Sequence, residues 1–403
     1  MEYRLKEILQ DKGYIRGPFG SSLKRNELKS TGIPVYEQQH AIYATREFRY
    51  YIDEEKYSQM KRFTVKPKDL IISCSGTIGK VDLISEKDPI GIISQALLIL
   101  RANTDIVLPE YLFYFLKSDY GYNSIISRSM GSVQVNIAKR EVIENIKINI
   151  PSLKEQEKIV KILSNIDEKI KLNNQINDNL YEITNKLYEQ LFFIERQDEW
   201  KEYNLQELMD ISNGYSYTGK ELVDTSAIGM ATIKNFERKG GFKEEGFKDI
   251  EPIKAKSIHY ADKFDILVAC TDLTQNADII GNAVMLLNTG KYEKVVISMD
   301  LVKILPKKNK YLVFSILNSK EFKNFALGYK TGTTVLHLNK NCFKDFNIKL
   351  PDLDKIEKFE KIVEINYKKI SSNLEENNTL TQLRDTLLPK LMNGEIDLDK
   401  IEI

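Results

Sequence analysis

The chain of 403 residues has few side chains that could serve as nucleophiles or metal ligands. The histidines and cysteines are His40, His259, His337, Cys74, Cys270 and Cys342. No two histidines have the spacing of zinc ligands, and the cysteines form no C-x-x-C pair. Cys74 and Cys270 end equivalent apolar stretches, where a small buried side chain is a simpler interpretation than a nucleophile. The sequence therefore predicts no metal centre and no catalytic residue.

Two motifs come close to sites for phosphate or for a metal-dependent nuclease. "GYSYTGKE" from Gly214 resembles a phosphate-binding loop, but Glu221 follows Lys220 where Ser or Thr would reach magnesium. "PDLDK" from Pro351 opens a helical stretch, where aspartates favour the positive end of the helix dipole. We therefore predict an ordinary loop and a helix cap, with no cofactor and no enzyme activity in this chain.

Charge is distributed unevenly, although the net charge is only +1. Residues 1–150 and 201–350 each carry an excess of four basic side chains, whereas residues 151–200 and 351–403 have an excess of three and four acidic ones. Basic modules are the usual mark of a polyanionic partner. The longest apolar run, "PIGIISQALLIL", is too short to span a membrane. With three unpaired cysteines, this favours a cytoplasmic protein without an anchor.

The second half of the chain repeats the first. Residues 148–192 and 348–392 share 14 of 45 positions without a gap, and "YRLKEIL" from Tyr3 matches "YNLQELM" from Tyr203. The repeating unit is thus about half the chain. Each unit consists of a globular module followed by a long segment with helical periodicity.

The long segments have the apolar seam of a coiled coil. In the first, the seam consists of Ile159, Leu163, Ile166, Ile170, Leu180, Leu187 and Leu191. Pro151 stands near the start, where proline is tolerated, and each helix should be on the order of 60 Å long. The second helix should run from about Asp352 to Met392, with Gly394 as its cap and Pro389 bending or fraying its last turn.

Four asparagines interrupt this seam: Asn173, Asn177, Asn373 and Asn377. Buried asparagines cost stability but fix the register of paired helices. If the helices run antiparallel with residue numbers that sum to 550, Asn173 faces Asn377 and Asn177 faces Asn373. The same rule pairs Ile170 with Leu380, Leu163 with Leu387, Ile159 with Leu391, and Leu187 with Val363. The alternative is that the asparagines face solvent.

Both modules have the same predicted order of elements. Strands are predicted in "DLIISCS", "KVDLIS" and "GIISQALLIL" of the first module and in "DILVACT", "NAVMLL" and "VVISMDLVKIL" of the second. A short helix follows, and then a turn at Gly131-Ser132 or Gly332-Thr333. Each module is therefore predicted to be a β-rich α+β domain.

The loops differ where the strands agree, which indicates two different ligands of one kind. "SGTIGK" from Ser75 corresponds to a loop from Thr271 that is six residues longer. Amides, hydroxyls and basic groups can read base edges and hold phosphates. The candidate DNA-binding residues are Ser21, Ser22, Lys24, Gln38, Gln39, His40, Ser75, Thr77, Lys80, Gln134, Asn213, Tyr215, Tyr217, Lys220, Lys234, Asn235, Thr274, Gln275, Asn276, Thr333, Thr334 and His337.

Taken together, these motifs resemble the specificity subunits of type I restriction-modification systems. The resemblance rests on "IPSLKEQEKIVKILSNIDEKI" with its second copy, on "LLPKLMNGEIDL", on "GPFGSSL" and on "GTTVLHLNK", and it covers essentially the whole chain. The second copy has Ile356 where the first has Gln156, so a glutamine is not required there.

The resemblance implies a pseudo-twofold arrangement of four parts. Residues 1–150 and 198–350 would be target-recognition domains for the two halves of a bipartite double-stranded DNA site. Residues 151–197 and 351–403 would supply antiparallel coiled-coil helices that set the gap and dock two methyltransferase subunits. Restriction subunits, which cleave DNA using ATP, would join the complex. The alternatives are a coiled-coil adaptor that binds proteins and an enzyme.

Overall fold

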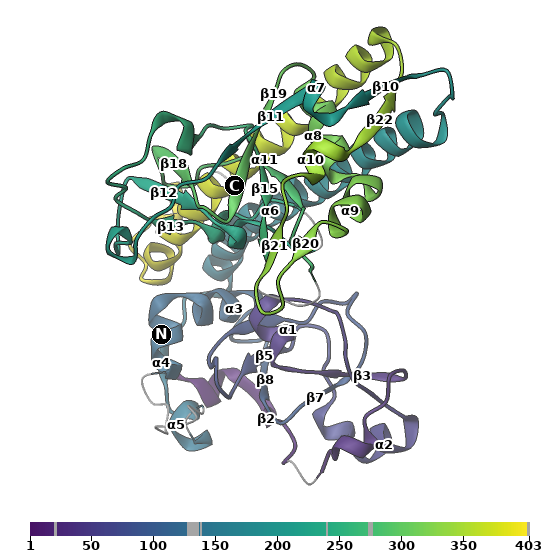
Figure 1. Ribbon diagram of the computed structural model, residues 1–403. Coiled ribbons are helices and arrows are strands. Elements are labelled where there is room, and N and C mark those ends of the chain that lie inside the picture. The colour runs from purple at the N-terminus through teal and green to yellow at the C-terminus, as the bar shows by residue number, and fades with distance from the viewer. Residues whose placement is uncertain (20–21, 127–136, 138, 239–240, 273–276, 401–403) are drawn as a thin grey trace. The chain divides into compact units, whose positions relative to one another are not determined.

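The computed structural model describes residues 1–19, 22–126, 137, 139–238, 241–272 and 277–400 (Figure 1). It is a mixture of helices and sheets, as predicted. Its contacts divide the chain into two compact units. Unit 1 comprises Met1–Glu168 and Thr381–Ile403, and unit 2 comprises Lys169–Leu380. Each unit therefore holds one globular module and a part of both long helices.

The module of unit 1 is built on a four-stranded sheet with the order β2-β8-β5-β6. A second sheet has the order β4-β3-β7, and β1 pairs with β9. The elements are β1 (Glu2–Arg4), β2 (Leu9–Arg16), β3 (Ile33–Tyr36), α1 (Gln38–Tyr43), β4 (Tyr51–Ile52), α2 (Glu54–Gln59), β5 (Leu70–Ser73), β6 (Val81–Leu83), β7 (Ile92–Ile93), β8 (Leu97–Ala102), α3 (Pro109–Lys117), α4 (Asp119–Ile126), α5 (Arg140–Glu144) and β9 (Lys147–Asn149).

The module of unit 2 repeats this plan. Its corresponding sheets have the orders β11-β19-β15-β17 and β13-β12-β18-β14, β10 pairs with β22, and a further sheet has the order β16-β21-β20. The elements are β10 (Lys201–Asn204), α7 (Leu205–Leu208), β11 (Met209–Asn213), β12 (Ile228–Ala231), β13 (Lys248–Asp249), β14 (Tyr260–Ala261), β15 (Ile266–Ala269), β16 (Thr271–Asp272), β17 (Ala283–Met285), β18 (Lys294–Ile297), β19 (Leu301–Pro306), α8 (Lys310–Asn318), α9 (Lys320–Leu327), β20 (Lys330–Thr331), β21 (Leu336–Leu338), α10 (Cys342–Asp345) and β22 (Asn347–Leu350). The predicted common order of strands and short helix is confirmed.

The central strands form because they are apolar on both faces. Every residue of β5 and β15 is buried, and these strands lie between two neighbours in their sheets. Continuous apolar runs of this length are typical of strands that are covered on both sides. Cys74 and Cys270 follow these strands and are buried, and burial raises the pKa of each thiol to about 12. Both cysteines therefore pack as apolar side chains.

The two long helices are α6 (Leu153–Tyr188) and α11 (Leu353–Met392). Asp352 accepts a hydrogen bond from the Lys355 N–H at 3.0 Å, which is the predicted cap. Pro389 lies inside α11, and the helix continues to Met392. Gly394, with φ +71°, then closes a Schellman motif in which the Glu395 N–H bonds to the Lys390 carbonyl at 2.9 Å.

The four seam asparagines meet in unit 2. Asn173 Nδ2 donates to Asn377 Oδ1 at 2.9 Å, and Asn373 Nδ2 donates to Asn177 Oδ1 at 2.8 Å. All four side chains are buried, so they do not face solvent. These are the pairs that the sum of 550 specifies, and within unit 2 the two helical segments run antiparallel.

The register extends beyond the asparagines. Asn366 Nδ2 donates to Thr184 Oγ1 at 3.1 Å, another pair that sums to 550. In unit 1, Arg384 Nη1 lies 2.9 Å from Asp167 Oδ1. Ile159, Leu163, Leu387 and Leu391 share one apolar cluster of unit 1, and Leu187 and Val363 share one of unit 2.

Gln156 links α6 to the module of unit 1. Its side chain is fully buried, accepts from the Leu108 N–H at 2.8 Å and donates to the carbonyls of Ile106 and Pro151 at 3.0 Å. In unit 2 the equivalent Ile356 is an apolar core residue, and Glu360 of α11 instead accepts from the Leu312 N–H in the first turn of α8 at 2.6 Å. A side chain of the long helix thus bonds to the start of α3 in one copy and to the start of α8 in the other.

We predict that Gln156→Leu lowers the free energy of unfolding by about 2–3 kcal/mol, because it leaves buried backbone groups without partners. Chemical denaturation of the full chain measures this. Glu157→Gln, which changes an exposed neighbour on the same helix, is the control and should have little effect. Equal stability of both variants would show that the Gln156 hydrogen bonds contribute nothing.

Candidate nucleic-acid interface

The predicted loops of each module gather at one edge of its main sheet. In unit 2, β11 and β15 are both antiparallel to β19, so they end at the same edge, where Asn213 is opposite Val302 and Ala269 is opposite Leu301. In unit 1, β2 and β5 are both antiparallel to β8, so they too end on the same side, where Arg16 is opposite Leu98. We use the name reading edge for the end of each main sheet at which these strands stop, marked by Arg16 in unit 1 and Asn213 in unit 2.

Each reading edge is shaped by a glycine that touches another backbone. A Cβ on Gly17 would lie 2.0 Å from the Ser94 carbonyl oxygen, and one on Gly214 would lie 1.9 Å from that of Ser298. Only glycine permits such a close approach. The glycines follow Arg16 and Asn213 directly, so these two side chains occupy equivalent positions of the repeat.

A third segment reaches each edge from the end of the module. The Ile137 N–H donates to the Cys74 carbonyl at 3.0 Å in unit 1, and the Leu338 N–H donates to the Cys270 carbonyl at 2.9 Å in unit 2. In unit 2 this segment is the hairpin β20–β21, and β21 also pairs with β16, which places Thr271 opposite His337. In unit 2 the start of the predicted loop, at Thr271, therefore lies beside the hairpin that contains the predicted turn.

In unit 1, the structure brings together part of the predicted set. Thr77 and Lys80 are exposed in the loop after β5, Ser75 is half-buried there, and the Lys80 ammonium lies 4.8 Å from the centre of the Tyr122 ring. Gln38 is close to this loop, since a Cβ on Gly76 would lie 3.8 Å from its Nε2. The remaining side chains of the set that the structure describes here are half-buried Gln39 and exposed Ser22 and Lys24.

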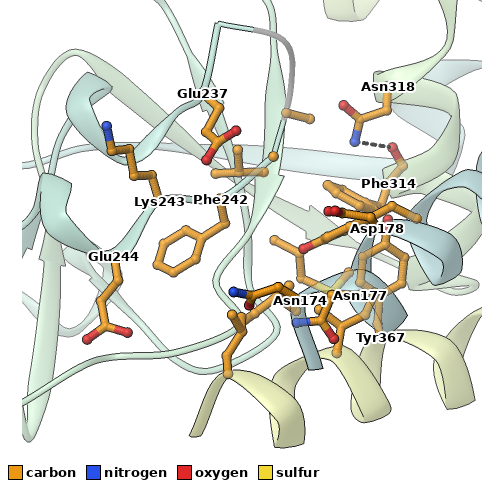
Figure 2. Close-up of a pocket in the computed structure, with 18 of the residues that line it drawn as sticks. Asn174, Asn177, Asp178, Glu237, Phe242, Lys243, Glu244, Phe314, Asn318 and Tyr367 are labelled. Carbon is orange, nitrogen blue, oxygen red and sulfur yellow. Dashed lines mark hydrogen bonds between the residues drawn. The ribbon is translucent and has the colours of Figure 1, made fainter. Parts of the chain in front are cut away.

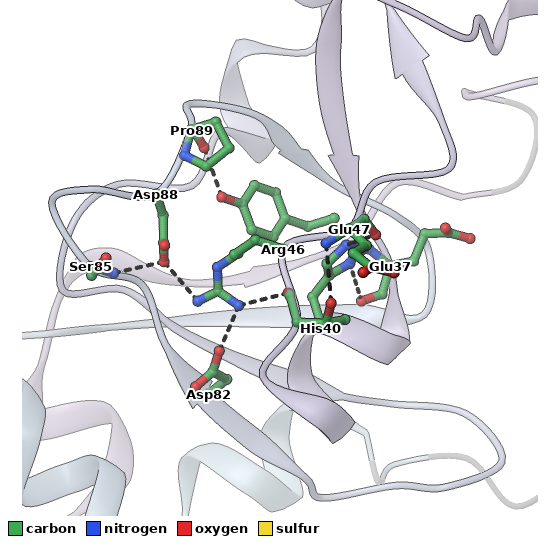
Figure 3. A network of polar contacts seen from close by, with 10 residues as sticks. Glu37, His40, Arg46, Glu47, Asp82, Ser85, Asp88 and Pro89 are labelled. Atoms are coloured by element: carbon green, nitrogen blue, oxygen red, sulfur yellow. Dashed lines mark hydrogen bonds and ion pairs between the residues drawn. The ribbon is translucent and has the colours of Figure 1, made fainter. Parts of the chain in front are cut away.

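His40 corrects the prediction. Its ring is fully buried and stacks on Phe48 with ring centres 4.6 Å apart. It also bonds to the backbone of Glu37 and Glu47 (Figure 3). Burial also lowers the pKa of His40, which favours the neutral ring. We remove His40 from the candidate contacts, because a side chain without exposed surface cannot reach DNA.

Arg46, beside His40, is also engaged within the module. It lies between two carboxylates, with Nη1 2.8 Å from Asp82 Oδ2 and Nη2 2.7 Å from Asp88 Oδ2 (Figure 3). Its positive charge is therefore compensated, and this region offers phosphate little attraction.

In unit 2, Asn213, Thr333, Thr334 and His337 are exposed at the reading edge or on its hairpin. Lys340 donates to Asn213 Oδ1 and so connects the base of the hairpin to the end of β11. Lys220, Lys234 and half-buried Tyr217 belong to other loops of the module. Ser21, Gln134, Thr274, Gln275 and Asn276 lie outside the described residues.

Two further candidates in unit 2 have structural roles instead. Tyr215 is buried and donates to Glu221, whose carboxylate also accepts the N–H groups of Thr218 and Ile253. The bond from the Ile253 N–H is the largest of the effects that lower the pKa of Glu221 to about 2. Asn235 is fully buried and bonds to the backbone of Thr232 and Lys243. We therefore remove Tyr215 and Asn235 from the candidates, and "GYSYTGKE" is a capped loop rather than a phosphate site.

Unit 2 also contains a cavity of about 760 Å³ that does not suit DNA (Figure 2). It lies between the long helices and the module, and Tyr367 of α11 and Phe314 of α8 form part of its apolar lining. The charged side chains in its lining are Asp178, Glu182, Glu237, Glu244, Glu245, Lys243 and Lys323. This acidic excess repels phosphate, so we exclude the cavity from the interface.

The structure adds three residues to the candidates that sequence reasoning had missed: Arg16, Lys330 and Lys340. Arg16 is half-buried at the reading edge of unit 1, and its buried Nη1 has no hydrogen-bond partner among the described residues. Because this nitrogen is itself buried, only the exposed part of the Arg16 guanidinium can reach a base edge or a phosphate. The signal was present in the repeat, because Arg16 precedes Gly17 as Asn213 precedes Gly214.

The described residues show neither a metal cluster nor a helix suited to a membrane. Within the described ranges, no three His, Cys, Asp or Glu side chains come together as a metal site would require. No helix in the described part of the chain is both long enough and apolar enough to cross a membrane.

Comparison with known proteins finds similarity to subunits of type I restriction-modification systems. A family profile described as "Type I restriction modification DNA specificity domain" matches residues 2–182. The chain is 25% identical to the type I restriction enzyme HindI specificity subunit of Haemophilus influenzae, over 76% of this chain and 81% of that protein. It is 23% identical to the MjaIX specificity subunit of Methanocaldococcus jannaschii, over 84% and 81%.

A solved structure has the same fold. The crystal structure of the S subunit of a type I restriction-modification system from M. genitalium superposes with a TM-score of 0.59. The superposition covers 97% of this chain and 95% of the other at 15% sequence identity.

Proposed function

Because the chain belongs to the specificity subunits of type I restriction-modification systems and confers DNA sequence specificity, we propose that each module reads one half of a bipartite DNA site. Residues 1–150 and 198–350 form the two target-recognition domains. Residues 151–197 and 351–403 form antiparallel coiled-coil spacers that set the gap between the half-sites. The pairing of the seam asparagines supports this role, since it fixes the register on which a constant gap depends.

The observation that carries the proposal is the repeated reading edge. Both edges have the same strands and the same close glycine, yet one presents Arg16 and the other Asn213. Arginine pairs best with guanine and asparagine with adenine in the major groove. A shared scaffold with different polar groups is what two half-sites of different sequence require.

We further propose that the chain has no chemistry of its own and acts in the cytoplasm. Two methyltransferase subunits and ATP-dependent restriction subunits would supply the reactions. The acidic cavity of unit 2 supports a protein partner at the helices, because its charge suits a basic segment and not DNA.

Binding to duplex DNA in the presence of the methyltransferase partner tests independent reading. Arg16→Gln should weaken binding by about tenfold to a hundredfold when the first half-site is intact and should have no effect when that half is scrambled. Asn213→Ala should do the same for the second half-site only. The physical reason is that each side chain contacts bases of one half.

Arg25→Gln removes an exposed charge from the same module as Arg16 and is the matched control. It should leave the preference for both halves intact. If Arg16→Gln weakens recognition of both half-sites equally, or of neither, the modules do not read independently.

A further inference from the structure

One segment of unit 2 is not explained by the differing loops. It is the hairpin β20–β21, which extends away from the main sheet of its module (Figure 1). Its strands pair Lys330 with Leu338 and Thr331 with His337. Gly332, with φ +99°, makes the turn, where a Cβ would lie 2.2 Å from the Val335 carbonyl oxygen. The hairpin is thus a defined, tight β-ribbon.

The hairpin is fixed to its module on one face only. Leu336 and Leu338 are buried in the core of unit 2, and the Asn339 N–H closes the base by bonding to the Tyr329 carbonyl at 3.0 Å. All residues from Lys330 to Thr334 are exposed, and so is His337. The outer face therefore presents an ammonium, hydroxyls and an imidazole, while the inner face is buried in the module.

The segment is also free of acidic residues. No Asp or Glu occurs between Glu321 and Asp345, a stretch that contains Lys323, Lys330, Lys340 and Lys344. The carboxylate of the adjoining Asp272 is buried and accepts the Ile279 N–H at 2.7 Å, so it does not face the outer surface. The corresponding sequence of the first module likewise has no acidic residue between Asp119 and Glu141.

The outer face of the hairpin offers a lysine ammonium, threonine hydroxyls and the N–H groups of a turn, and its sequence contains no carboxylate that would repel phosphate. Lysine, threonine and backbone N–H groups in a turn are typical phosphate contacts. Resting on the proposed function, we propose that the hairpin Lys330–Leu338 holds the DNA backbone of its half-site and reads no base.

The test is the salt dependence of duplex binding by the full chain with its methyltransferase partner. Lys330→Gln should lower the slope of log K against log salt by about one, equally for a duplex with the target site and for a scrambled one. The ratio of the two affinities should stay constant. Lys308→Gln, an exposed lysine of the same module outside the hairpin, should leave the slope unchanged.

Two results would overturn the phosphate contact. An unchanged slope for Lys330→Gln shows that Lys330 meets no phosphate, and an altered sequence preference at the second half-site shows that the hairpin reads bases. Failure of the proposed function has a different signature, because the unmodified complex would then bind target and scrambled duplexes equally.

Discussion

Insertion of one heptad into each long helix should widen the gap between the two recognised half-sites by about three base pairs. The matched positions lie between Ile170 and Lys171 and between Thr379 and Leu380, which the 550 register places opposite each other. Seven helical residues add about 10.5 Å, and one base pair rises about 3.4 Å. The bases read in each half should stay the same, since both reading edges are untouched. Mapping of methylated sites in cells that carry the variant measures the gap.

The control is a heptad inserted at the first position alone. It shifts the helices against each other, so that the pair Asp167–Arg384 in unit 1 and the pairs Asn173–Asn377 and Asn177–Asn373 in unit 2 cannot form together. This variant should lose stability and site-specific methylation. A matched insertion that preserves methylation at the original gap would show that the helices do not act as the spacer.

Asp69→Ala should lower the free energy of unfolding by about 3–5 kcal/mol, the largest effect we expect from a single substitution. The Asp69 carboxylate is buried and receives Arg101 Nε at 2.7 Å and Nη2 at 2.6 Å. It also accepts the Lys66 N–H at 2.8 Å. Removal of the Asp69 carboxylate leaves the mostly buried Arg101 guanidinium without its partner. Chemical denaturation of the full chain measures the change in the free energy of unfolding.

Lys147→Ala is the matched control in the same unit. It breaks the ion pair with Glu2 at 2.7 Å, but both side chains are more than half exposed. Exposed pairs are worth at most about 1 kcal/mol. Similar losses for Asp69→Ala and Lys147→Ala would contradict the stabilising role of the buried pair.

The repeat made much of this fold predictable from sequence. Continuous apolar runs predicted the strands of both main sheets, because every side chain of a strand that is covered on both faces is buried. The seam with its asparagines indicated the antiparallel register, since polar groups on an apolar seam are stable only when they meet. Asp352 and Gly394 marked the helix ends by local rules that depend on few neighbours.

The site was less predictable, because burial depends on the tertiary fold. His40, Tyr215 and Asn235 have side chains suited to reading bases, yet they are buried and bond to backbone groups 7, 39 and 8 residues away along the chain. Arg16 was missed for a different reason. Its equivalence to Asn213 is visible in the sequence only when Gly17 is aligned with Gly214, and the pairing of β2 with β8 establishes that alignment.

The most direct test of the central claim is genome-wide mapping of methylated bases in cells that express the methyltransferase partner with and without this chain. We predict one bipartite motif that is methylated only when the chain is present, and Arg16→Gln should affect its first half alone. Methylation that does not depend on the chain, or a motif without two separate halves, would contradict the account.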